Sequence, residues 1–260
     1  PMIIRTPIVP GINDTAENVK NTADFIKTLK NVRIVMVGGS PFDETSEQQS
    51  NSWKNKNKVM QRISEFQRVA AEQNGWEFID FNAPMTAINE REQAVNPKFT
   101  LCGTDRIHPG NDGHMVMAYL YLKAQGFSGN PVAEFEVDAA KLKALREENC
   151  SISNIEGNRR EIKFDYLAEA LPYPMDTITR GWGAIGTQAG AAKVVPFVEE
   201  MNREIISVKG LKSGTYGLYI DGEECGDFDA KELAEGVNLA AIDCTPQYQQ
   251  ALAVMHLNEI

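Results

Sequence analysis

The sequence predicts an α/β domain with a parallel sheet, followed by a smaller β-rich or α+β C-terminal extension. Three observations support this fold class. Strand patterns alternate with helix patterns over the first half of the chain, as they do in parallel α/β domains. The run VRIVMVGG at 32–39 is almost continuously apolar, which is typical of a strand buried on both faces. After about residue 128 the pattern changes to short strands, Gly/Pro-rich loops and a hairpin signal.

The elements of the first half follow from periodicity and capping residues. Strands are expected where apolar and β-branched or aromatic residues dominate, at 2–9, 32–39 and 76–82. Helices are expected at about 16–30, 55–74 and 109–124, and the last has a proline in its first turn. Four apolar residues recur at helical spacing along the second helix: Val59, Ile63, Phe66 and Ala70.

The C-terminal extension is expected at 132–260. The charged segment DAAKLKALREE at 138–148 predicts a helix, and VVPFVEEMNREII at 194–206 predicts a short one. The segment 209–228 alternates like two strands around an Asp221-Gly222 turn, which is a strong hairpin signal. The organisation predicted is therefore an uncertain strand–helix segment at 1–31, an α/β region at 32–128 and the extension.

Composition excludes several classes of function. The 260 residues carry a net charge of −10 without a Lys/Arg cluster, which disfavours nucleic-acid binding. No apolar run is long enough for a membrane span. Four widely spaced cysteines without a CxxC pair disfavour zinc ribbons and iron–sulfur clusters. The chain opens with a proline inside a strand pattern, so we expect it to begin within a longer chain; a signal peptide upstream would make it periplasmic or secreted. The oligomeric state stays open.

The candidate site lies in TLCGTDRIHPGNDGH at 100–114. Asp105 and His108 are three residues apart in a loop before a helix, so both side chains can converge on one point. A carboxylate beside an imidazole fixes its tautomer and makes a general base for activating a hydroxyl, which is worth about 10²–10⁴-fold in rate.

Other interpretations of the same stretch stay open. Asp105 could simply cap the helix, with His108 a satisfied surface or core residue. A metal site would need His114 as well, but the spacing turns the two imidazoles apart, and His114 is expected to pack within the helix. Cys102 could be a nucleophile with His108 as its base, although nothing nearby marks the thiol as activated.

The block GTDRIHPGNDGHMVMAYLYLKAQG resembles the last conserved block of the SGNH (GDSL-type) esterase superfamily, and the similarity extends over about 32–250. It implies a partial three-layer, flavodoxin-like α/β/α domain that hydrolyses acyl or carbohydrate esters without a cofactor or metal. It further implies that His108 is the catalytic base and Asp105 its orienting acid. The family's Gly-Asp-Ser motif is absent, so the nucleophile is missing; Ser40 in GGSP is a weak substitute. GIND at 11–14 resembles the Gly-x-Asn-Asp block of this superfamily, whose asparagine donates a hydrogen bond to the oxyanion. The resemblance therefore implies that Asn13 is an oxyanion donor.

Residues 1–31 also resemble a late segment of the radical-SAM activating enzymes of glycyl-radical enzymes, which would make Asn13 a turn residue. The CxxxCxxC motif of that family is absent, so a working activase is excluded and a remnant is the alternative. A second alternative is a non-catalytic fragment that binds carbohydrate or a partner. Four aromatic residues could then form a sugar platform, although core packing is the commoner role: Trp76, Trp182, Tyr173 and Tyr216.

Overall fold

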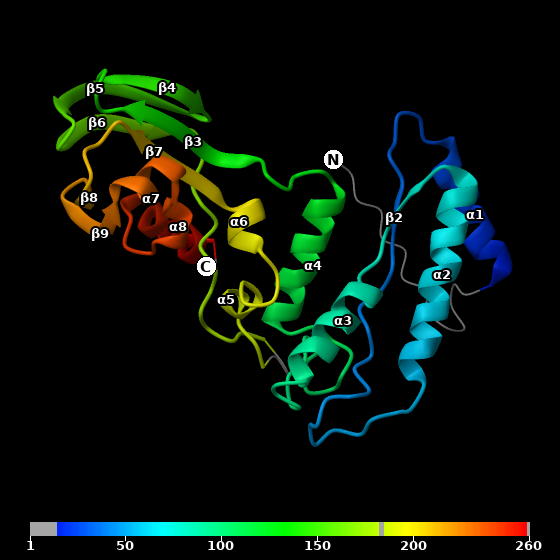
Figure 1. The fold of residues 1–260 in the computed structure, drawn as a ribbon. Coiled ribbons are helices and arrows are strands. Elements are labelled where there is room, and N and C mark those ends of the chain that lie inside the picture. Colours follow the sequence, from blue (N-terminus) through cyan, green and yellow to red (C-terminus); the bar gives the residue numbers. More distant parts are fainter. Residues whose placement is uncertain (1–14, 182–184, 259–260) are drawn as a thin grey trace.

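The computed structural model describes residues 15–181 and 185–258 and contains both helices and strands, as the α/β prediction requires (Figure 1). From residue 15 onward, the N-terminal half contains α1 Ala16–Thr28, β1 Val35–Val37, α2 Lys56–Asn74, β2 Glu77–Ile79, α3 Asn82–Gln93 and α4 Asn111–Ala124. The predicted helices and the second and third strands are confirmed, although both strands are shorter than expected. The predicted strand at 2–9 lies outside the described residues. No helix in the described ranges is long and apolar enough to cross a bilayer.

β1 and β2 form a two-stranded parallel sheet joined by α2. The register pairs Val35 with Glu77 and Val37 with Ile79. A connection through a helix is what a parallel pair requires. The core beside this sheet is built from β2, α3 and α4, with Met85, Leu101 and Val116 almost completely buried. Sheet, helices and core together hold the loop that carries Asp105 and His108.

The C-terminal half is centred on a four-stranded sheet of order β10-β7-β3-β4 and two antiparallel hairpins, β5–β6 and β8–β9. Its strands are β3 Pro131–Asp138, β4 Lys143–Glu148, β5 Cys150–Asn158, β6 Glu161–Ala168, β7 Arg203–Lys209, β8 Thr215–Ile220, β9 Glu223–Asp229 and β10 Val237–Asn238. Its helices are α5 Gln188–Ala191, α6 Phe197–Met201, α7 Ala230–Glu235, the 3₁₀ turn Leu239–Ala241 and α8 Pro246–Leu257. The predicted hairpin is confirmed, because Asp221 and Gly222 both have positive φ in the turn between β8 and β9.

The predicted charged helix at 138–148 is wrong. The segment is a turn followed by β4, which pairs antiparallel with β3. Asp138 Oδ1 accepts the N–H groups of Ala140 and Lys141 at 2.9 and 3.0 Å, which closes the turn. Cross-strand pairing then outweighs helix propensity, since Arg146 lies opposite Glu136 and forms a salt bridge with Glu134. The helix predicted at 194–206 is confirmed only in part, because β7 begins at Arg203.

The two halves of the chain share packing along α4. Ala191, Val195 and Phe197 belong to the same buried cluster as Met115 and Tyr119. The Tyr119 hydroxyl donates to Glu200 at 3.0 Å, and Lys123 Nζ bridges to the same carboxylate at 2.9 Å. The predicted boundary between the α/β region and the C-terminal extension, near residues 128–132, therefore stays a prediction. Residues from both sides of this boundary pack in one core.

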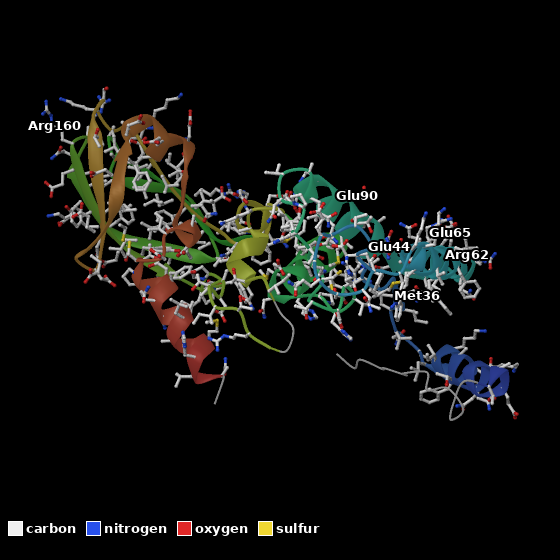
Figure 2. All side chains as sticks on the ribbon, turned by 90° about the horizontal axis from the view of Figure 1, so that it is seen from below. Met36, Glu44, Arg62, Glu65, Glu90 and Arg160 are labelled. Carbon is white, nitrogen blue, oxygen red and sulfur yellow. The ribbon has the colours of Figure 1, made fainter. Side chains whose placement is uncertain are left out.

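The apolar stripe of α2 is exposed, contrary to what its helical spacing would suggest. Val59, Ile63 and Phe66 are 54%, 55% and 72% exposed. Within the described residues β1 pairs with β2 along one edge, and no strand pairs with its other edge. Figure 2 shows α1 projecting away from the body of the molecule. Among residues 15–181 and 185–258, one edge of β1 is therefore unpaired and one face of α2 is exposed.

Candidate functional site

The loop that carries Asp105 and His108 is closed at its base by the backbone. Cys102 and Pro109 form an isolated antiparallel bridge, and Gly110 N–H donates to Leu101 O at 3.0 Å. The turn inside the loop places Arg106 at φ +69°, in the left-handed region. α4 begins directly after the loop, with Gly110 as its N-cap residue. The loop is therefore a short, fixed connection at the start of a buried helix.

Asp105 and His108 are in direct contact, as predicted. Asp105 Oδ2 is hydrogen-bonded to His108 Nδ1, and Oδ1 accepts the backbone N–H of His108 at 3.0 Å and of Ile107 at 3.1 Å. Because these N–H groups precede α4, the interpretation of Asp105 as the helix cap is wrong. The His108 side chain is 77% exposed and that of Asp105 29%. A reactant from solvent can therefore reach the imidazole.

Two opposing effects set the pKa of Asp105. Partial burial raises it, while hydrogen bonds from the His108 ring and from the backbone N–H groups of His108 and Ile107 lower it. The hydrogen bonds dominate, so the pKa of Asp105 lies below its ordinary value. An ionised carboxylate on Nδ1 favours the tautomer with its proton on that nitrogen, which leaves Nε2 to accept a proton.

Arg106 is the structural residue of the site that the sequence did not reveal. Its side chain is almost completely buried, and its guanidinium donates five hydrogen bonds of 2.9–3.1 Å to the backbone carbonyls of residues 43, 46, 48 and 50. Asp43 N–H donates back to Arg106 O at 2.8 Å. The Arg106 side chain thus fixes the loop after β1 against the loop that carries Asp105 and His108.

The two candidate nucleophiles do not contact the imidazole. The Ser40 hydroxyl donates to Ile107 O at 3.3 Å, so Ser40 lies beside the loop of Asp105 and His108 and is hydrogen-bonded to its backbone. Cys102 is fully buried, with its thiol against Pro41 O at 3.3 Å. Burial and then the nearby Asp43 carboxylate raise the pKa of Cys102 to about 12, which keeps it a thiol at neutral pH.

The remaining candidate residues do not join the site. His114 is exposed on α4, so its predicted packing role is wrong. In the described residues, no group of three or more His, Cys, Asp or Glu side chains has the arrangement of a metal site. Asn13 and Trp182 lie outside the described residues. Trp76 precedes β2 while Tyr216 lies on β8 at the opposite end of the molecule, so these two do not form one sugar platform (Figure 1).

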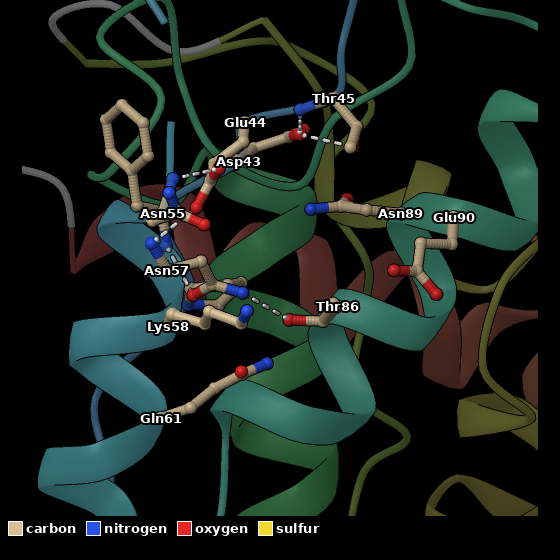
Figure 3. Close-up of a pocket in the computed structure, with 12 residues that line it drawn as sticks. Asp43, Glu44, Thr45, Asn55, Asn57, Lys58, Gln61, Thr86, Asn89 and Glu90 are labelled. Atoms are coloured by element: carbon tan, nitrogen blue, oxygen red, sulfur yellow. Dashed lines mark hydrogen bonds between the residues drawn. The ribbon is translucent and has the colours of Figure 1, made fainter. Parts of the chain in front are cut away.

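A polar pocket of about 220 Å³ lies between the loop after β1, the start of α2 and α3 (Figure 3). Much of its lining is already hydrogen-bonded. Asp43 accepts from the backbone of Thr45 and Ser46, and Glu44 accepts the backbone N–H groups of Asn55 and Asn57 at 2.6 and 2.7 Å. Asp105 and His108 do not line this pocket. Asp43 and Glu44 therefore hold the loop after β1 and the start of α2 in place.

Comparisons with known proteins give one informative match. No family model and no curated protein matches the chain. A solved structure described as BT4096, a gut microbial diltiazem-metabolizing enzyme, is 57% identical and superposes with a TM-score of 0.85. The match covers 94% of this chain and 55% of that chain, so the chain spans about half the length of the enzyme it resembles. A match of this extent is longer than residues 32–260 and therefore reaches into residues 1–31.

Proposed function

We propose that this chain is the acid–base part of an SGNH-type ester hydrolase, with a partial three-layer α/β/α domain. The contact between Asp105 Oδ2 and His108 Nδ1 carries the proposal. In the complete reaction, a serine hydroxyl gives its proton to His108 Nε2 as its oxygen attacks the ester carbonyl. His108 then returns the proton to the leaving alcohol, which leaves an acyl-serine. Water, deprotonated by His108, attacks this acyl-serine and releases the acid and the free serine, and Asp105 stabilises the imidazolium that forms in each half of the reaction.

The nucleophile in this proposal comes from a strand outside the described residues. The free edge of β1 can accept a parallel strand, whose carboxyl end would lie beside the loop of Ser40. That loop contacts the catalytic loop through the Ser40–Ile107 hydrogen bond. The exposed residues of α2 give an added segment an apolar surface to cover. The matched enzyme is long enough to contain such a segment, because only 55% of it is covered.

The substrate in this proposal is a small-molecule or carbohydrate ester. The similarity to a diltiazem-metabolizing enzyme supports an enzymatic role and a small-molecule substrate. Diltiazem carries an acetate ester, which is the type of bond that a serine activated by His108 would cleave. Diltiazem and p-nitrophenyl acetate are therefore suitable test substrates.

The test compares two polypeptides. Residues 1–260 alone are expected to hydrolyse neither ester above background and to remain unlabelled by a fluorophosphonate probe. A longer polypeptide that contains this sequence and a Gly-Asp-Ser strand is expected to release acetate from diltiazem. In that longer protein, His108→Ala should lower kcat by at least ~10³-fold, while His114→Ala, an exposed histidine on α4, should leave it unchanged.

Two results would contradict the proposal. Rapid hydrolysis by residues 1–260 that His108→Ala abolishes would mean that the nucleophile is already present. Full activity of the longer protein with His108→Ala would remove His108 from the mechanism.

A further inference from the structure

Two of the four cysteines, widely separated in the sequence, meet in the C-terminal half. Cys225 lies on β9, and Cys244 lies just before α8, whose N-cap is Thr245. The Cys244 thiol donates to the backbone carbonyl of Glu224, the residue before Cys225, with Sγ 3.6 Å from the oxygen. Both thiols are free in the structure, and burial together with the nearby Cys244 thiol raises the pKa of Cys225 to about 11. Two thiols from different elements are thus adjacent.

Cys225 lies at a β-bulge in the β8–β9 hairpin. The register between β8 and β9 passes from Leu218–Gly226 to Tyr219–Glu224, so Cys225 is an extra residue without a cross-strand partner. An inserted residue of this kind redirects its side chain and bends the strand. The Cys225 side chain is consequently buried, whereas Cys244 is exposed.

We propose that Cys225 and Cys244 form a disulfide that links the β8–β9 hairpin to the start of α8. The bond would fix a helix that also contacts the sheet through Gln247, whose side chain donates to Glu204 on β7 at 3.0 Å. Disulfides persist in oxidising compartments. The disulfide would therefore form in a periplasmic or extracellular protein, and both cysteines would stay reduced in a reducing compartment.

The chemistry is thiol–disulfide exchange with a small-molecule disulfide. The exposed Cys244 thiolate attacks oxidised glutathione, which forms a mixed disulfide and releases one reduced glutathione. The Cys225 thiolate then attacks Cys244 Sγ and releases the second glutathione. Two protein thiols are oxidised by two electrons, and one glutathione disulfide is reduced to two thiols.

Peptide mapping after incubation with oxidised glutathione tests this inference on the intact protein. The expected result is a Cys225–Cys244 cross-linked peptide, loss of two hydrogen atoms in mass, and free Cys102 and Cys150 after denaturation. The oxidised form should melt ~5–10 °C above the reduced form. Cys244→Ser, at an exposed position, should abolish both effects, while Cys150→Ser should preserve them.

Three results would overturn the inference. These are a stable glutathione adduct at Cys244 with Cys225 still reduced, a cross-link between other cysteines, and four free thiols after prolonged oxidation. Each can be read from the same mass spectrum, and none depends on esterase activity.

Discussion

Asp105 holds His108 through both of its carboxylate oxygens. Oδ2 contacts the ring at Nδ1, and Oδ1 accepts the backbone N–H of the same residue at 3.0 Å. The imidazole is therefore fixed in position and direction by one neighbour, while the side chain stays 77% exposed. This geometry suits a general base, because the ring is held in place while its other nitrogen can be reached from solvent.

Asp105 should stabilise the fold in a pH-dependent way. Its pKa is depressed, so its contribution is present above the ordinary pKa of an aspartate and is lost as pH falls through the lower folded value. Asp105→Asn should therefore lower Tm at pH 7, and the difference from the wild type should vanish near the acid end of the transition. Thermal melts at several pH values measure this, with Asp227→Asn on β9 as the exposed control. An equal effect of both substitutions would contradict the role of Asp105.

Arg106 should be a stability residue. Arg106→Ala leaves the carbonyls of residues 43, 46, 48 and 50 without its five hydrogen bonds, which should cost about 3 kcal/mol in the free energy of unfolding. Arg68→Ala removes exposed ion pairs with Glu65 and Glu72 and should cost no more than about 1 kcal/mol. Urea denaturation compares the two variants. Similar losses would mean that Arg106 does not anchor the loop.

Glu204 should destabilise the fold at high pH. Its side chain is fully buried; Oε1 accepts from Tyr166 and Gln247, and Oε2 has no partner among the described residues. Burial raises the pKa of Glu204, while these two hydrogen bonds lower it and offset burial only in part. Since the folded state favours the protonated form, stability should fall as pH rises above the ordinary pKa of a glutamate.

Glu204→Gln removes this pH dependence because an amide keeps the acceptor oxygen without the charge. The variant should melt above the wild type at pH 8, and the gain should disappear near pH 4. Melting temperatures of both proteins at the two pH values test this prediction. A difference in melting temperature that is the same at both pH values would mean that Glu204 does not titrate in this range.

Phe66 should contribute little to the stability of residues 1–260. It is 72% exposed, so Phe66→Ala should change the free energy of unfolding by less than about 1 kcal/mol. Phe135→Ala, at a fully buried position, should cost about 3–5 kcal/mol. In a longer protein whose added segment covers α2, the cost at Phe66 should rise toward that of Phe135. An unchanged cost there would argue against a segment on this face.

Helices α1, α2 and α4 could be predicted because their capping and periodicity are local, whereas α3 lies where the sequence predicts mostly loop. Thr15 caps α1 and Gly75 ends α2, and both signals are visible in the sequence. The segment 138–148 could not be predicted in the same way, since its charged residues have good helix propensity. Its strand conformation depends on pairing with β3, which no local pattern encodes.

The Asp105–His108 contact could be predicted from the spacing of the two residues. The hydrogen bonds of Arg106 that hold the same loop in place could not be predicted. Arg106 reaches carbonyls that lie 56–63 positions earlier in the chain, and the sequence contains no signal for that contact. The exposure of Val59, Ile63 and Phe66 is equally non-local, because the same helical spacing serves a buried or an uncovered face. Sequence spacing thus predicted the Asp105–His108 contact, while the structure showed which side chain fixes the loop that carries it.

The tautomer of His108 tests the central claim most directly. Nitrogen chemical shifts of the imidazole, measured by NMR in alkaline solution, report which nitrogen carries the proton. The proposed role predicts the proton on Nδ1, facing Asp105, with Nε2 unprotonated, and predicts that Asp105→Ala shifts the population toward the Nε2–H form. A wild-type His108 that already carries its proton on Nε2 would contradict the assignment of His108 as a base oriented by Asp105.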